Sequence, residues 1–332
     1  MLLTPANLHI YTRILADLKT LHKHNFCERI SKKRQRVYLI KKFYFCFQMN
    51  NTLNLTDEQF QLHHSEKCDL LIHLGSRNIA FAIIDKSQQQ LKVLTDKPVY
   101  ENDQHIPLVR RLDNLRELTL VLQQKFRKVK ISVETPAFTF IPQELYSKDL
   151  LEQYGHFIRL ADGTELKIST IYSAGIKNIT AMDTLLIKEL NSRFNQPSIF
   201  SSIHPFIEST LQIVKKDSST QLFLNFCEAA FEAAYFEKGK FIFYNKFEYA
   251  TADEFNYFLL NIIQQLNVDL KNTAVQLSGK IEHEDELVDR MEKYFDEINF
   301  AGIFHMVKVP SIIASQASLH NYFSLISLGL CE

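Results

Sequence analysis

Glycine is scarce in this sequence. Only eight of the 332 residues are glycine, about a third of what an average usage of roughly 7% would give. Phosphate-binding loops need glycine, because backbone N–H groups must approach the anion without a Cβ in the way. No two glycines are close enough to form G-x-G-x-x-G or G-x-x-x-x-G-K-[ST], so the sequence is not typical of an ordinary NTPase. The eight are Gly75, Gly155, Gly163, Gly175, Gly239, Gly279, Gly302 and Gly329.

Long hydrophobic runs and a disulfide pattern are also missing. The most apolar early run, residues 37–47, is interrupted by Lys41 and Lys42 and is too short for a membrane span, which needs about 20 residues. The N-terminus lacks the order of a secretory signal. The five cysteines are odd in number and widely spread, which is typical of reduced thiols. We therefore expect a cytoplasmic protein without a membrane span.

The net charge of zero conceals an uneven distribution. Residues 1–48 contain ten Lys/Arg and two acidic residues, a net of +8, which leaves 28 basic and 36 acidic residues, a net of −8, in the rest. Because phosphate neutralisation needs surplus Lys/Arg, the acidic body is not expected to bind nucleic acid.

Residues 1–48 form a basic N-terminal extension. Three interpretations stay open: a start-site artefact upstream of Met49, a disordered tail, or an arm for an anionic partner. His22, His24 and Cys27 have no fourth partner at zinc-finger spacing, so no metal site is predicted.

A predicted β-hairpin at residues 68–85 organises the chain. Residues 70–74 and 79–84 are rich in β-branched and aromatic side chains, and Gly75 begins the turn between them. A third strand is expected at 91–100. The first half then continues with a helix at 108–122, a strand at 129–133, an extended segment at 137–146, a helix at 147–154 stopped by Gly155, strands at 166–172 and 176–182, and a helix at 183–194.

The second half repeats this order. Three strands are expected at 221–227, 231–236 and 241–247, and a helix begins at the capping box of Thr251 and Glu254. We further expect a strand at 274–277, a helix at 283–295, a strand at 300–304 and a helical region at 312–328. Two units result, residues 66–196 and residues 197–332.

This twofold order resembles the actin-like ATPase superfamily of actin, Hsp70 and sugar kinases. The segments IHLGSRNIAFAI, AFTFIP and VQLSGK are similar to an uncharacterised bacterial family, domain of unknown function 3822. The resemblance implies an α/β, duplicated ribonuclease H-like fold. Each half would hold a mixed sheet, a three-strand antiparallel meander plus parallel strands, flanked by helices. It also implies a nucleotide cleft between the halves, with an Asp-x-Gly phosphate hairpin in each half and a Gly-Gly turn on the adenosine side.

The sequence departs from that pattern at all three motifs. His73 stands at the Asp position of the first hairpin; Asn225 and Cys227 stand at the Asp and Gly positions of the second. Lys280 replaces the second glycine after Gly279. Since Mg²⁺ prefers anionic oxygen, an imidazole or an amide cannot replace a carboxylate there. We therefore predict no metal site.

The preferred hypothesis is a non-catalytic actin-like protein, a pseudo-ATPase that acts as a protein-binding platform or stabilising subunit in the bacterial cytoplasm. The alternative is an active nucleotide-dependent kinase or ATPase with an atypical site in the cleft, in which Glu134 is the general base and Lys280 contacts phosphate. ATP would be a cofactor only under the alternative. The expected partner is another protein, and a homodimer is one candidate assembly. The candidate cofactor-binding residues are Gly75, Ser76, Arg77, Asn225, Gly279 and Lys280.

Overall fold

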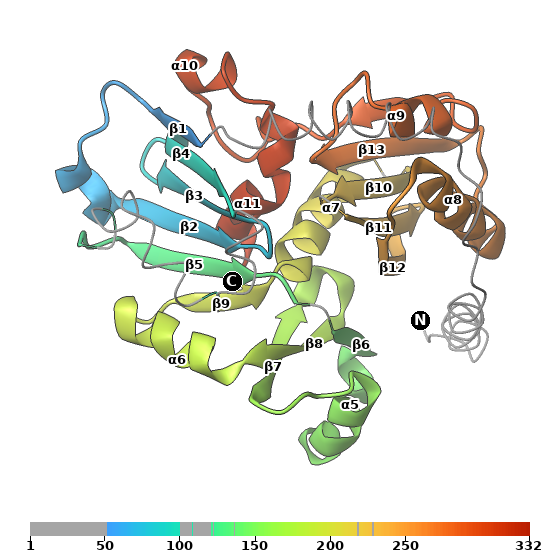
Figure 1. The fold of residues 1–332 in the computed structure, drawn as a ribbon, viewed down its shortest axis with the longest axis horizontal. Coiled ribbons are helices and arrows are strands. Elements are labelled where there is room, and N and C mark those ends of the chain that lie inside the picture. Colours follow the sequence, from blue (N-terminus) through green and yellow to red (C-terminus); the bar gives the residue numbers. More distant parts are fainter. Residues whose placement is uncertain are drawn as a thin grey trace, which may run out of the picture.

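The computed structural model describes residues 52–99, 108, 121, 123–135, 137–217, 219–227 and 229–332 (Figure 1). Within these ranges, no helix is long and apolar enough to cross a membrane. The extension 1–48, with His22, His24 and Cys27, and most of the helix predicted at 108–122 lie outside the described residues.

The first sheet is built on the predicted hairpin. Its strands are β1 (Leu53–Thr56), β2 (Cys68–Leu74), β3 (Asn78–Asp85), β4 (Gln90–Pro98), β5 (Lys128–Val133) and β9 (Ser198–Ser201). The strand order is β1-β4-β3-β2-β5-β9, in which β2, β3 and β4 form an antiparallel meander and β5 and β9 run parallel to β2. This is the mixed sheet expected from the sequence.

The second sheet repeats this topology. It contains β10 (Thr220–Phe226), β11 (Ala230–Glu237), β12 (Lys240–Glu248), β13 (Thr273–Gly279) and β14 (Ile298–Phe300), in the order β12-β11-β10-β13-β14. Again the first three strands form an antiparallel meander and the others run parallel to β10. Even the irregularities correspond, because the register shifts once in each meander, between Ile83 and Ile84 in β3 and between Tyr235 and Phe236 in β11.

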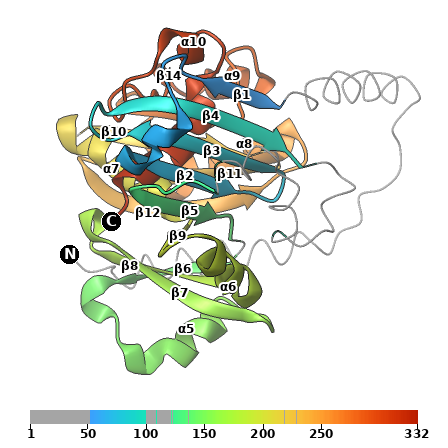
Figure 2. The same cartoon turned by 90° about the vertical axis from the view of Figure 1, so that its left-hand side faces the viewer.

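The part of the chain between β5 and β9 forms a third, smaller sheet, called the inserted sheet. It consists of β6 (Phe138–Pro142), β7 (Thr164–Ile171) and β8 (Ile176–Asp183), in the order β6-β8-β7. Figure 2 shows this sheet and helix α5 (Leu151–Phe157) as a separate layer below the first sheet. The sequence predicted extended segments and strands here, but not that they form a sheet of their own.

Helices cover the sheets and fill the space between the two lobes, which are the parts of the chain built around the first and the second sheet. They are α6 (Thr184–Arg193), α7 (Ile203–Asp217), α8 (Ala252–Leu266), α9 (Glu286–Met291), α10 (Ser311–Ala314) and α11 (Phe323–Ser327). Asp183 and Thr251 cap α6 and α8 through side-chain oxygens, as the sequence predicted, but the Glu254 carboxylate accepts from the Ala250 N–H and not from that of Thr251.

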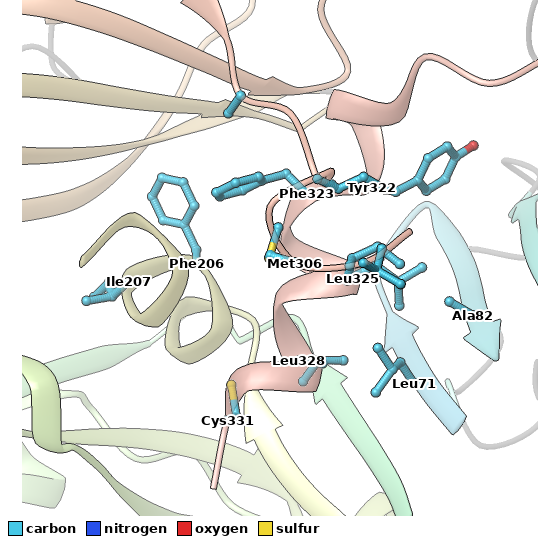
Figure 3. Packing of buried hydrophobic residues seen from close by; sticks show 14 of the residues in the cluster. Leu71, Ala82, Phe206, Ile207, Met306, Tyr322, Phe323, Leu325, Leu328 and Cys331 are labelled. Carbon is cyan, nitrogen blue, oxygen red and sulfur yellow. The ribbon is translucent and has the colours of Figure 1, made fainter. Parts of the chain in front are cut away.

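One hydrophobic core joins the lobes. It contains Leu71 and Ala82 from the first sheet and Phe223 and Tyr244 from the second, with α7 and α11 between them. Figure 3 shows α11 placed between the first sheet and α7. Past α11, the Lys130 ammonium of β5 donates to the carbonyl oxygens of Gly329 (3.2 Å) and Cys331.

Several predicted boundaries are wrong. The division at 196–197 falls too early, because β9 pairs with β5 and therefore completes the first sheet. Gly155 does not stop a helix: it is buried within α5, which continues to Phe157. The strand predicted at 300–304 is β14 and ends at Phe300. The sequence also missed β1 and α7.

Candidate functional site

Equivalent positions in the two lobes carry the same side-chain hydrogen bond. His73 on β2 is opposite Ser132 on β5, and its Nδ1 lies 3.0 Å from the Ser132 Oγ. Asn225 on β10 is opposite Ser278 on β13, whose hydroxyl donates to the Asn225 Oδ1 at 2.9 Å. His73 and Asn225, at the two positions where the resemblance implies Asp, therefore each contact a serine of the neighbouring parallel strand.

Four charged residues also fall at positions that correspond between the two lobes: Asp96 matches Lys246, and Glu134 matches Lys280. Asp96 on β4 and Lys246 on β12 occupy matching positions, because Asp96 is opposite Ala80, itself opposite His73, and Lys246 is opposite Glu232, itself opposite Asn225.

Glu134 and Lys280 also correspond. Each lies two residues after the serine described above, just beyond the end of β5 or β13.

The first cross-lobe ion pair joins Glu134 to Lys246. The Lys246 Nζ donates to the Glu134 Oε1 at 2.6 Å, and the Ser76 backbone N–H of the first hairpin donates to the Oε2 at 2.8 Å. Both side chains are largely buried, with 18% of Lys246 and 24% of Glu134 exposed. The carboxylate thus accepts a backbone N–H of its own lobe and the ammonium group of the other lobe.

The second cross-lobe ion pair joins Lys280 to Asp96. The Lys280 Nζ donates to the Asp96 Oδ2 at 2.7 Å. Asp96 also accepts from the Asn78 Nδ2 at 2.9 Å and from the Tyr322 hydroxyl at 3.3 Å, and Lys280 lies 5.6 Å from the centre of the Tyr322 ring. The two pairs are related by the internal twofold repeat, with their charges reversed.

Electrostatic surroundings keep Glu134 ionised. Burial by itself raises the pKa of Glu134, but the Lys246 ammonium and the hydrogen bonds from Lys246 and Ser76 outweigh it and lower the pKa to about 2. The pKa of Lys246 is raised: burial lowers it, and Glu134 more than offsets that effect.

A neutral imidazole lies among these charges. Burial lowers the pKa of His73; Lys246 and Lys280 lower it further, while Glu134 and Asp96 raise it. His73 therefore adds no positive charge beside the two ion pairs at neutral pH.

A second polar group lies beside Asn225. The Asn225 Nδ2 donates to the Glu232 Oε2 at 2.6 Å, and the Tyr244 hydroxyl donates to the Oε1 at 2.6 Å. Glu232 is only 3% exposed, and burial raises its pKa. The Asn225 amide thus binds a buried carboxyl group of its own lobe.

At two glycines a Cβ would come close to neighbouring atoms. A Cβ on Gly75 would lie 2.7 Å from the Asn78 Oδ1 and 3.0 Å from the His73 Nε2. Gly279 has a φ of +82°, and a Cβ there would lie 2.1 Å from the Phe226 carbonyl oxygen. That oxygen accepts from the Lys280 N–H at 2.8 Å, so this glycine shapes the turn that carries Lys280.

The structure places most of the predicted site residues where the two lobes meet. Gly75 and Ser76 lie at the first hairpin, Gly279 and Lys280 at the turn after β13, and Glu134 joins the two lobes. Arg77 lies in the first hairpin, where its carbonyl accepts from the Val99 N–H at 2.7 Å. Cys227 lies half-buried at the second hairpin, where its N–H donates to the Ala230 carbonyl at 2.8 Å.

Sequence reasoning missed the partners of these residues. The sequence pattern assigns Asp96, Lys246 and Glu232 only to strands and Tyr322 to a helical region. One signal was available: each of the three charged residues interrupts a strand that is otherwise mostly apolar or buried. Charged side chains are rarely buried unless they are paired, so such interruptions indicate cross-lobe or in-lobe partners.

The donor set does not fit a magnesium nucleotide. His73 and Asn225, where the resemblance implies Asp, carry neutral side chains, and the carboxylates nearby, Glu134 and Asp96, are each paired with a lysine. Within the described ranges, no three His, Cys, Asp or Glu residues are grouped so that they could hold a metal ion.

Solved structures with the same fold include two that span most of this chain. A Bacteroides thetaiotaomicron VPI-5482 protein with an actin-like ATPase fold and unknown function is 19% identical; the match covers 82% of this chain and all of that one, with a TM-score of 0.69. PilM in the PilM-PilN type IV pilus biogenesis complex is 10% identical, with 79% and 97% coverage and a TM-score of 0.58. A search of curated proteins gives no match.

A family model also matches the chain. The model describes a protein of unknown function (DUF3822) and covers residues 57–298. This range includes both hairpins, the inserted sheet and all four residues of the cross-lobe ion pairs. The chain therefore belongs to the DUF3822 family and has a duplicated, actin-like ATPase fold.

Proposed function

We propose that this protein is a pseudo-ATPase, a non-catalytic actin-like protein that acts as a protein-binding platform or stabilising subunit in the bacterial cytoplasm. The cross-lobe ion pairs take over the structural role that a bound nucleotide has in the resembled superfamily. They do so because they join the two lobes beside the hairpins.

The position of Glu134 carries this proposal. Its carboxylate accepts the Ser76 N–H at 2.8 Å and the Lys246 ammonium at 2.6 Å, which are the kinds of donor that a phosphate oxygen would use. A nucleotide phosphate would have to displace an ionised carboxylate that belongs to the same chain and therefore does not dissociate.

The geometry gives less support to an active kinase or ATPase. A general base works best when its pKa is near the working pH, whereas the pKa of Glu134 is about 2. Lys280, the candidate phosphate contact, is paired with Asp96 at 2.7 Å.

A scaffold role is compatible with this fold. PilM, whose fold this chain shares, was solved in a complex with PilN. Affinity capture from the native host would identify the protein partner of the present chain.

The proposal is tested by thermal unfolding with ATP or ADP, each with and without Mg²⁺, at millimolar concentration. A ligand at a hundred times its Kd stabilises the native state by about 2.7 kcal/mol, so a bound nucleotide would raise the Tm clearly. We expect no rise. A rise that depends on Mg²⁺, together with ATP hydrolysis that is lost in Glu134→Gln, would establish the enzyme instead.

A further inference from the structure

Strand β7 is an edge of the inserted sheet. The order β6-β8-β7 places it at the end, and it is eight residues long, Thr164–Ile171. Among the described residues, no strand pairs with its outer side. A long free edge is a template for another strand, so proteins usually cover or blunt such edges.

The charges on β7 are self-complementary. Glu165 is exposed and Lys167 is half-buried; being two residues apart, they point to the same face of the strand. In the described part of the chain, neither forms an ion pair. A single lysine can blunt an edge strand, but here a glutamate of opposite charge accompanies it on the same face.

We propose that β7 pairs with β7 of a second copy of this chain, antiparallel about a twofold axis at Leu166. This register places Glu165 of each copy opposite Lys167 of the other, which gives two cross-strand pairs of opposite charge. Shifting the axis to Lys167 or Ile168 loses both charge pairs, so the charges select one register.

Exposed apolar side chains at the two ends of β7 fit the same arrangement. Leu160, four residues before the strand, is 41% exposed, and Tyr172, directly after it, is 72% exposed. Antiparallel pairing brings the end of one strand beside the beginning of the other. Tyr172 of each copy then lies near the end that carries Leu160 in its partner, and both lose contact with water.

The resulting dimer has one continuous sheet of six strands, in which the two β7 strands are central. A twofold interface uses the same surface on both copies and closes, so it gives a dimer and not a filament. This inference goes beyond the proposed function and is independent of it, because β7 contributes no residue to the cross-lobe ion pairs.

Charge reversal tests the pairing and its register. We would measure the mass of the full chain by sedimentation equilibrium over a range of concentrations. We expect a dimer for the unaltered chain and at least a tenfold weaker association for Lys167→Glu and for Glu165→Lys, since each change makes both pairs repulsive. Mixing the two variants should restore a dimer, because each copy then offers charges of one sign to the opposite charges of the other.

Each outcome of these measurements supports or refutes the pairing of β7 with β7. Circular dichroism checks that both variants are folded, and recovery in the mixture does so independently. A monomeric unaltered chain would refute the proposal; so would a dimer that both charge reversals leave intact, or two variants that do not associate when mixed. The nucleotide experiment above does not depend on any of these results.

Discussion

At the scale of single residues, two cross-lobe ion pairs occupy corresponding positions of the two lobes. The positions that correspond in the two lobes carry Glu134 and Lys280 in one case and Asp96 and Lys246 in the other. Each residue just beyond a parallel strand meets the meander of the opposite lobe, so the repeat is kept while the charges are exchanged.

A double-mutant cycle measures the first ion pair. Glu134→Gln and Lys246→Met should each destabilise the protein by about 1–3 kcal/mol, because each leaves a largely buried partner unpaired. We expect a coupling energy of about 1–2 kcal/mol from urea denaturation at pH 7. Additive effects would mean that the two side chains do not interact.

The second pair serves as the matched comparison. Asp96→Asn and Lys280→Met should couple less, by about 0.5–1 kcal/mol, because 41% of the Lys280 side chain is exposed to solvent and its charge is therefore screened. An equal or larger coupling at this pair would contradict the argument from burial.

Acid should weaken the contribution of Glu134 to the free energy of unfolding. The pKa of Glu134 falls from its ordinary value of 4.5 to about 2 in the folded protein, so its stabilising effect is complete above pH 4.5 and is lost between pH 4.5 and pH 2. The difference in unfolding free energy between the unaltered chain and Glu134→Gln should shrink as the pH falls through this window. Denaturation series at several pH values would check this; a constant difference would count against the ion pair.

At the scale of elements, the end of β13 depends on a single glycine. Gly279→Ala adds a Cβ at 2.1 Å from the Phe226 carbonyl, on a backbone with a φ of +82°. We expect a loss of at least about 3 kcal/mol, or failure to fold, because the backbone of β10 cannot move aside.

Gly163→Ala is the control for that substitution. Its φ of +78° is similar, but a Cβ would have nothing within 4 Å. It should cost only about 1–2 kcal/mol, which is the strain of the left-handed conformation alone. Equal losses in the two variants, measured by urea denaturation, would show that the close approach to Phe226 has no effect.

Local sequence patterns explain which helices and strands could be predicted and which boundaries and contacts could not. Local alternation and turn chemistry predicted both meanders, and Asp183 and Thr251 marked the starts of α6 and α8. The boundary near residue 196 failed because β9 is short and pairs with β5, 68 positions earlier at Lys130↔Ser198, which no local pattern reports. The Glu134–Lys246 pair likewise joins residues 112 positions apart.

At the scale of the whole molecule, the shared core predicts one unfolding unit. Side chains of both sheets and of α7 and α11 belong to a single cluster. Calorimetry should therefore show one transition with equal calorimetric and van't Hoff enthalpies. Two separate transitions would show that the lobes are thermodynamically independent.

A substitution in α7 should weaken both lobes together. Phe206 is fully buried in the shared core, and Phe206→Ala should cost about 3–5 kcal/mol while keeping a single transition. Phe304→Ala, at a side chain that is 65% exposed, should change stability by less than about 0.5 kcal/mol. Urea denaturation followed by circular dichroism would measure both.

The position of α11 also affects how the chain is made. Strands β2 and β3 leave the ribosome early, yet the face that carries Leu71 and Ala82 is covered by residues 323–331, which are synthesised about 240 positions later. Domains usually fold as units while they are translated, but this lobe has to keep an apolar face uncovered until translation reaches α11. Nascent chains arrested before α11 should therefore be sensitive to proteases and should bind chaperones, although every strand of the first sheet has already been made.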